Sequence, residues 1–338
     1  MPLLRYFNSD LVRERHRRWP ILESYDVDLR LHPYLTHMYP PNYRSSTFNT
    51  DGEGFRVSHF PSGCVDSESW PDVESGGLLT GASTAFGAGV TSDRKTIASN
   101  LAFKLDLPVL NLGFPGANSY QQLVAVLPHI DRARFVAFVS GWIPLVAHLR
   151  SGANAGGYEP LYYQRMYQEL SKDPLFDLYE VALRQRQFES SAPPDSMATS
   201  SPIRDRSRSD FVERMRLAIR TQRRDLSLIK TVMGPHRQVV FGLQPLCHRL
   251  TRKMTDEEIE LSAFHREMFG DERTEFELET AKIWPQYASE MKEMCGEIGV
   301  DFVELAAEQF EGWSFFDSTH FTDLGAEQTA SFLAKYIT

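Results

Sequence analysis

The fold can be worked out from one short segment, Gly-Leu-Leu-Thr-Gly-Ala-Ser-Thr-Ala-Phe-Gly at residues 77–87. Its apolar start predicts a strand that is buried on both faces of a parallel sheet. Small residues follow, and Gly81 and Gly87 allow the sharp turns that leave space beside the Ser83 hydroxyl. Ligands of open α/β sheets bind at the carboxyl ends of the strands. The segment therefore predicts a strand that ends in a site built around Ser83.

Strand-like and helix-like segments alternate along the chain from this point. Apolar runs of strand length are separated by segments whose apolar residues recur at helical spacing. This alternation favours a parallel sheet that is covered by helices on both faces. The predicted strands are 78–80, 108–112, 135–139, 238–243 and 300–305.

The later helices are predicted from the same periodicity together with residues that begin or break helices. Apolar residues at helical spacing predict helices over 210–232, 255–269 and 275–298. The last of these is expected to break near Pro285, because proline lacks the backbone N–H that a helix needs. Asp323 is expected to cap a final helix.

Composition limits the classes of partner. The 338 residues suffice for one large domain or two modest ones. A formal net charge of −9 argues against nucleic acid or an anionic membrane as the main partner. The longest apolar run, 135–149, is too short to span a bilayer, and the first residues lack the apolar core of a signal peptide. We therefore expect a cytoplasmic protein without a membrane span; the oligomeric state stays open.

No cofactor or metal is expected from the motifs. The three cysteines are widely spaced and form no Cys-x-x-Cys pair, so neither a disulfide framework nor a zinc site is implied. No phosphate-binding loop or dinucleotide fingerprint occurs at a strand end. No cluster of His, Cys and carboxylate residues has the spacing of a metal site.

A second polar segment, near the C-terminus, provides partners for Ser83. It has Asp317 and His320 three residues apart, just before the final predicted helix. A serine hydroxyl is a weak nucleophile until a base takes its proton, and the base needs a third group to orient it. We expect Ser83 as the nucleophile, His320 as the general base and then acid, and Asp317 as the group that orients His320. The alternative is that these residues only shape tight turns.

Three blocks of the sequence resemble those of the SGNH (GDSL-like) hydrolase superfamily. They are Gly81-Ala82-Ser83 followed by Gly87, Asn-Leu-Gly-Phe-Pro-Gly-Ala-Asn-Ser at 111–119, and Asp-Ser-Thr-His at 317–320, in the family order. The resemblance implies a flavodoxin-like three-layer α/β/α fold of the α/β class with a five-stranded parallel sheet. It also implies a serine-dependent acyl hydrolase, an esterase or thioesterase, that forms an acyl-enzyme on a small-molecule ester or thioester.

The oxyanion donors follow the resemblance only in part. The backbone N–H groups of Ser83 and Gly116 match two family donors. The third family donor is an Asn side chain in a Gly-x-Asn-Asp block, and this chain has Gly-Trp-Ile-Pro at 141–144 instead. Ile143 cannot donate from its side chain, so the block is degenerate. Asn118 or Gln244 are the candidate substitutes, although Asn118 is better explained as a helix cap.

Trp142 is a candidate for the substrate-binding wall. Together with the tyrosines at 158, 162 and 163, it is expected either to line an acyl or aromatic pocket over Ser83 or simply to pack in the core.

The chain is expected to divide near residue 75. Residues 1–75 contain prolines that force extended segments and a turn at Asp51-Gly52. They resemble the preface of a bacterial SGNH-like subgroup and are predicted to form an N-terminal extension packed on the core. Residues 76–338 form the predicted hydrolase domain, with an insertion at about 145–208 that is rich in Gly, Ser, Pro and Arg.

Two further functions are consistent with the same residues. An SGNH-type acyltransferase would use the same nucleophile but pass the acyl group to an alcohol or amine. A non-catalytic SGNH-like binding protein is suggested by the degenerate block.

Overall fold

The computed structural model describes residues 19, 27, 29–32, 34–150, 208–269 and 271–337. The insertion predicted at about 145–208 lies almost wholly outside the described residues and stays a prediction. The same holds for the tyrosines at 158, 162 and 163.

One parallel sheet of five strands forms the centre of the described chain. Its strand order is β6-β5-β7-β8-β9. The strand that comes first in the sequence, β5, therefore lies between the second, β6, and the third, β7. This is the flavodoxin-like order, in which ligands bind where the path reverses direction. The predicted α/β fold with a five-stranded parallel sheet is confirmed. The strands are β5 (Gly76–Gly81), β6 (Val109–Gly113), β7 (Ala133–Ser140), β8 (Gln238–Leu243) and β9 (Asp301–Glu304).

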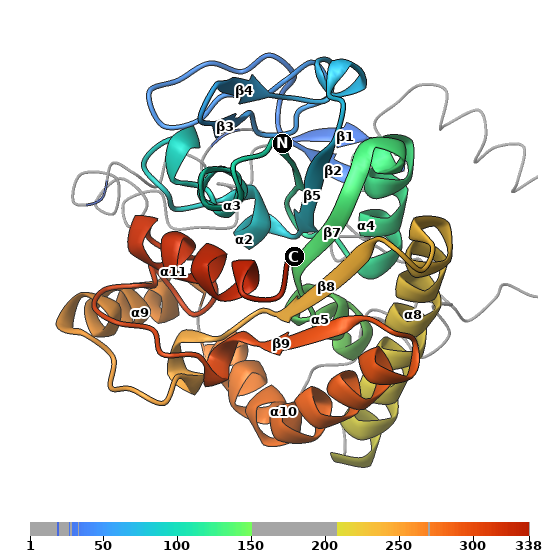
Figure 1. The fold of residues 1–338 in the computed structure, drawn as a ribbon. Helices are drawn as coiled ribbons and strands as arrows, with labels where there is room; N and C mark the ends of the chain where they lie inside the picture. The colour runs from blue at the N-terminus through green and yellow to red at the C-terminus, as the bar shows by residue number, and fades with distance from the viewer. Residues whose placement is uncertain are drawn as a thin grey trace, which may run out of the picture.

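Helices cover both faces of this sheet, as Figure 1 shows. Helices α3 and α11 lie on one face, whereas α4, α5, α8 and α10 lie on the other. Within the described ranges, no helix combines the length and the apolar character that crossing a membrane requires. The helices are α2 (Ser83–Phe86), α3 (Ile97–Leu105), α4 (Ser119–Val126), α5 (Trp142–Arg150), α8 (Arg208–Met233), α9 (Asp256–Phe269), α10 (Asp271–Glu297) and α11 (Asp323–Ala334).

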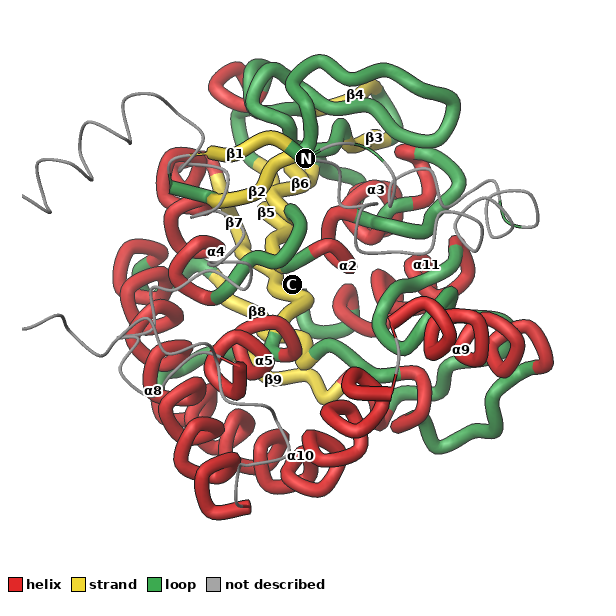
Figure 2. The backbone as a smooth tube through the Cα atoms, turned by 180° about the vertical axis from the view of Figure 1, so that it is seen from behind, coloured by secondary structure: helices red, strands yellow, loops and turns green. Residues whose placement is uncertain are grey.

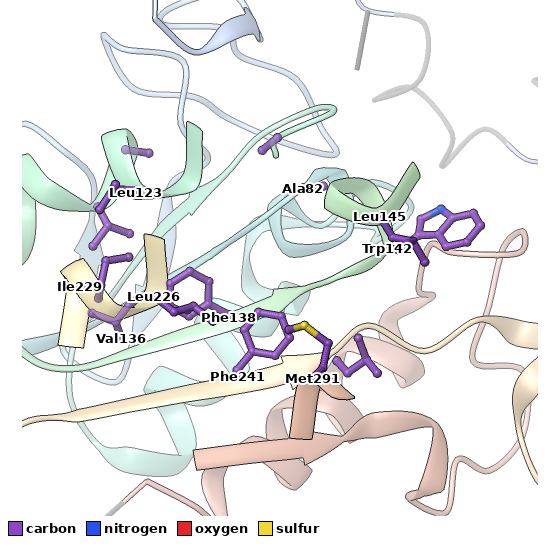
Figure 3. Close-up of a cluster of buried hydrophobic side chains, with 14 of the residues drawn as sticks. Ala82, Leu123, Val136, Phe138, Trp142, Leu145, Leu226, Ile229, Phe241 and Met291 are labelled. Carbon is purple, nitrogen blue, oxygen red and sulfur yellow. The ribbon is translucent and has the colours of Figure 1, made fainter. Parts of the chain in front are cut away.

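The core has two parts because successive strand residues face opposite sides of the sheet. On β7, Phe138 points into the core shared with α8, and Val139 points into the core shared with α3 and α11. Phe138 stacks on Phe241 of β8 with ring centroids 5.9 Å apart, and Leu226 of α8 lies beside them (Figure 3). Both faces of β7 are therefore apolar, as expected for a central strand of a covered parallel sheet.

The N-terminal part of the described chain packs at one end of this sheet (Figure 2). Phe55 and Trp70 belong to the core on the α8 side of the sheet, and the Trp70 Nε1–H donates to the His129 carbonyl. The predicted turn at Asp51 is present: its Oδ1 accepts backbone N–H groups from three following residues. The division of the chain near residue 75 stays a prediction. The two hairpins here are β1 (Arg30–His32) with β2 (Thr36–Met38), and β3 (Ser58–Phe60) with β4 (Gly63–Val65).

Two local predictions are wrong. Helix α10 continues through Pro285 instead of breaking there. A proline inside a helix costs about 3 kcal/mol, but each large apolar side chain that α10 buries returns about 1.5–3 kcal/mol, and Trp284, Tyr287 and Met291 are all buried. The cap of α11 is Thr322, whose side chain accepts the Gly325 N–H, so Asp323 is the first helical residue.

Candidate active site

Ser83 lies at the carboxyl end of β5. The next two strands in the sequence, β6 and β7, lie on opposite sides of β5, so this is the topological switch point of the sheet. Helix α2 begins at Ser83, separated from the end of the strand by the single residue Ala82, and contains four residues. Gly81 has φ +153° and Gly87 has φ +93°, both in the region that favours glycine. These two glycines turn the chain sharply on either side of the serine.

The structure brings His320 and Asp317 into line with Ser83. The Ser83 Oγ lies 2.7 Å from the His320 Nε2, and the His320 Nδ1 lies 2.8 Å from the Asp317 Oδ2. With the ring proton on Nδ1, the imidazole donates to the carboxylate and accepts from the hydroxyl. A hydroxyl bound to an imidazole that a carboxylate orients is the arrangement of an activated nucleophile.

The loop that carries this pair is closed by its own hydrogen bonds. The Asp317 Oδ1 accepts the backbone N–H groups of Thr319 at 2.7 Å and of His320 at 2.8 Å. The Phe316 N–H donates to the His320 carbonyl at 2.9 Å. Asp317 therefore shapes the turn with one oxygen and holds the imidazole with the other.

Gln244 links the nucleophile to this loop. Its Nε2 donates to the Thr84 Oγ1 at 2.9 Å and to the Thr319 carbonyl at 3.2 Å. The Thr84 hydroxyl donates to the same carbonyl. The two amide hydrogens of Gln244 are thus directed to α2 and the loop, which makes Gln244 a tie between them rather than an oxyanion donor.

Glu258 anchors the start of the loop, a role that sequence reasoning missed. Its Oε1 accepts the backbone N–H groups of Ser314 and Phe315 at 3.0 and 3.2 Å. Both carboxylate oxygens also accept from Arg252. Burial alone would raise the pKa of Glu258, but the hydrogen bonds from Arg252 and from backbone N–H groups outweigh it and lower the pKa. The sequence Thr255-x-x-Glu258 signals a capping box, which is present, but it gives no hint of the distant loop.

The Gly-Trp-Ile-Pro segment at 141–144 forms the turn after β7 and the start of α5. The buried Tyr287 hydroxyl donates to the Gly141 carbonyl at 2.8 Å and accepts from the Gln222 Nε2 at 2.9 Å. Burial raises the pKa of Tyr287, so it stays a neutral donor. The pair of strands β5 and β7 is in register at Gly81 and Val139, so this turn lies beside Ser83. No sequence signal identified Tyr287 or Gln222.

The other three predicted site residues are backbone or buried groups. Gly116 has φ +69°, and its N–H donates to no acceptor within the described part of the chain. Asn118 caps α4 by accepting the Gln121 N–H, as its alternative explanation proposed. Trp142 is 5% exposed and packs near Trp284, with ring centroids 6.0 Å apart.

Metal ligands do not gather in the part of the chain that the structure describes: no three His, Cys, Asp or Glu side chains lie close enough to hold an ion.

Comparisons with known proteins give likenesses of fold at low identity. No protein-family model matches the chain, and no curated protein is significantly similar to it. A phospholipase A1 from Streptomyces albidoflavus NA297 is 12% identical, with a TM-score of 0.37 over 78% of this chain and 99% of that one. A carbohydrate acetylesterase family member from Sinorhizobium meliloti is 11% identical, with a TM-score of 0.40 over 77% and 96%. The M. smegmatis aryl esterase is 13% identical, with a TM-score of 0.40 over 78% and 98%. Likenesses this weak carry no argument about activity.

Proposed function

We propose that this chain is a serine-dependent acyl hydrolase of the SGNH type, an esterase or thioesterase that works through an acyl-enzyme. The observation that supports it is the line of contacts from the Ser83 hydroxyl to the His320 imidazole and on to the Asp317 carboxylate, at 2.7 and 2.8 Å. The SGNH-like sequence blocks at these same residues point in the same direction.

The reaction proceeds in two balanced steps. The Ser83 Oγ attacks the substrate carbonyl carbon while the His320 Nε2 takes the hydroxyl proton. The tetrahedral intermediate collapses, the bond to the leaving oxygen or sulfur breaks, and His320 returns the proton to that atom. Water then attacks the acyl-Ser83 carbonyl with His320 again as base, which releases the carboxylic acid and restores the hydroxyl. Asp317 holds the imidazole and stabilises its charged form in both steps.

The oxyanion donors in this proposal are the backbone N–H groups of Ser83 and Gly116. The Gly116 N–H is uncommitted within the described residues, as such a donor must be. Ile143 replaces the third donor of the family, and losing one donor costs roughly 10²–10³ in turnover. We therefore propose a slow hydrolase with a two-donor site.

Loss of that donor also favours a second candidate, a non-catalytic binding protein with the same fold. In that case the polar side chains of Ser83 and His320 would bind a ligand, and no reaction would follow. The acyltransferase alternative shares the first step of the hydrolase and differs only in what attacks the acyl-enzyme.

One set of assays separates these functions. Hydrolysis of short p-nitrophenyl esters and thioesters is measured for the wild type, for Ser83→Ala and for Ser331→Ala, which removes a hydroxyl on the outer turn of α11. We expect turnover in the wild type and in Ser331→Ala, and loss of more than about 10³-fold in Ser83→Ala. Equal turnover in Ser83→Ala would refute the mechanism. Products formed with added alcohols or amines distinguish transfer from hydrolysis.

A further inference from the structure

We infer that Arg56, from the N-terminal part of the chain, is a positioning residue for the Ser83 nucleophile. The inference rests on the proposed hydrolase function and adds a residue to it. Arg56 is 1% exposed, so it cannot touch a substrate that enters from solvent. Its effect on Ser83 has to pass through the helix that carries the serine.

The Arg56 guanidinium joins three segments that are distant in sequence. Its Nε donates to the Asp93 Oδ1 at 2.8 Å, its Nη1 to the Gly87 carbonyl at 2.7 Å, and its Nη2 to the Thr47 carbonyl at 2.7 Å. A planar guanidinium reaches three acceptors at once, whereas an ammonium is a point charge on a flexible stem. Lysine at this position would therefore keep the charge and lose most of the geometry.

The contact to Gly87 fixes the end of the nucleophile helix. The Gly87 and Ala88 N–H groups both donate to the Ser83 carbonyl, at 3.1 and 2.9 Å. Helix α2 has only four residues, and a helix this short does not hold its own geometry. Strand β5 fixes the start of α2. At the other end, Arg56 holds the carbonyl of Gly87, the residue that caps the helix.

The surroundings make this contact rigid. Asp93 also accepts the Asn49 backbone N–H and side-chain N–H at 3.1 and 2.6 Å, so the carboxylate is fixed from two sides. The guanidinium carbon lies 5.5 Å from the ring centroid of Phe86, the last residue of α2. Tyr39 stacks on that ring with centroids 4.1 Å apart. Side chains from residues 39–56 thus enclose the end of α2.

The distance that depends on this clamp is the 2.7 Å between the Ser83 Oγ and the His320 Nε2. A displacement of about 1 Å in a reacting group costs up to about 10²-fold in rate. Arg56→Lys is therefore expected to lower kcat and the rate of fluorophosphonate labelling at Ser83 by about 10- to 100-fold. KM should change by less than about twofold, because Arg56 contributes nothing to ground-state substrate contacts.

Arg237→Lys is the matched control. Arg237 also donates from its guanidinium to backbone carbonyls, those of Met233, Ile130 and Val232. It directly precedes β8 and thus lies at the amino ends of the parallel strands, whereas Ser83 lies at their carboxyl ends. If arginine-to-lysine substitutions act only by loosening the fold, both variants lose activity alike.

The experiment compares kcat, KM and labelling rate at a temperature where circular dichroism shows each variant to be folded. If Arg56→Lys does not fold, the double variant Arg56→Met with Asp93→Asn replaces it, since it leaves no unpaired buried charge. Slow labelling in the Arg56 variant alone, with KM unchanged, supports the inference. A folded Arg56 variant that labels at the wild-type rate, or an equal loss in Arg237→Lys, overturns it. Absence of labelling in the wild type would instead overturn the proposed function and the inference together.

Discussion

Asp317 uses each carboxylate oxygen for a different purpose. Its Oδ1 accepts the N–H groups of Thr319 and His320, and its Oδ2 contacts the His320 Nδ1. The first oxygen forms the turn, and the second sets which imidazole nitrogen carries the proton. One substitution at Asp317 can therefore remove the orientation of the imidazole while it keeps the turn.

Asp317→Asn should keep the turn and remove the activity. The amide oxygen still accepts the two backbone N–H groups, but the amide NH₂ then faces the His320 Nδ1. Nδ1 must accept, Nε2 carries the proton, and the imidazole no longer takes the Ser83 proton. We expect kcat to fall about 10⁴-fold with little change in the thermal unfolding midpoint. Near-wild-type kcat in the folded variant would show that Asp317 does not orient the base.

At the scale of single elements, Tyr287 connects α10 to the β7–α5 turn. Tyr287→Phe keeps the ring but leaves the Gln222 donor and one bond of the Gly141 carbonyl unmade. Leaving buried polar groups unpaired costs about 1–3 kcal/mol, and we expect that loss in the free energy of unfolding, measured with urea. Thr280→Val is the control on the same helix, because among the described residues the Thr280 hydroxyl bonds only the Phe276 carbonyl of α10. An equal loss in both variants would contradict a special role for Tyr287.

The loop that carries Asp317 and His320 should loosen in acid. The pKa of Glu258 is lowered in the folded state from its ordinary value of 4.5. Because the folded pKa is depressed, the stabilisation is complete above the ordinary value and is lost as pH falls through the lower, folded value. The wild type should therefore lose stability below about pH 4.5.

Glu258→Gln tests this dependence. The variant should be less stable at neutral pH, and its free energy of unfolding should fall less steeply than that of the wild type below about pH 4.5. Glu257→Gln, at an exposed position on the same helix, serves as the control. Parallel pH profiles for the wild type and Glu258→Gln would show that this carboxylate does not carry the acid sensitivity.

At the scale of the whole molecule, the sequence predicted the sheet and the contacts of Ser83, His320 and Asp317, but not the residues that support them. All five strands were predicted, and four of them are mostly apolar runs of the kind that a covered parallel sheet requires. The fifth, β9, is shorter and carries an exposed Asp301 and Glu304 around its apolar centre. The contacts among Ser83, His320 and Asp317 could be predicted because ligand sites of open α/β sheets lie at strand ends and because Asp-x-x-His is a short spaced motif. Their catalytic role stays a proposal. Ser83 and His320 are 237 residues apart in the sequence, and the fold nevertheless brings their side chains into contact.

The supporting residues could not be predicted, because each acts through a contact between distant segments. Arg56 looks like one charge in a turn-rich stretch, and Tyr287 looks like one apolar residue on a helix. Glu258 gives a local capping signal that accounts for only one of its oxygens. Pro285 misled the helix prediction because burial along α10 outweighs the local cost of the proline. Periodicity and motifs thus locate elements and candidate groups, whereas tertiary packing decides which residues hold them.

The most direct test of the account is labelling with a fluorophosphonate probe followed by peptide mapping. The probe phosphonylates a serine only where a base and oxyanion donors activate it. We predict one adduct, on Ser83, in the wild type, and none in Ser83→Ala or in a folded His320→Ala variant. A wild-type protein that stays unlabelled, or an adduct on another residue that persists in Ser83→Ala, would contradict the proposal that Ser83 is an activated nucleophile.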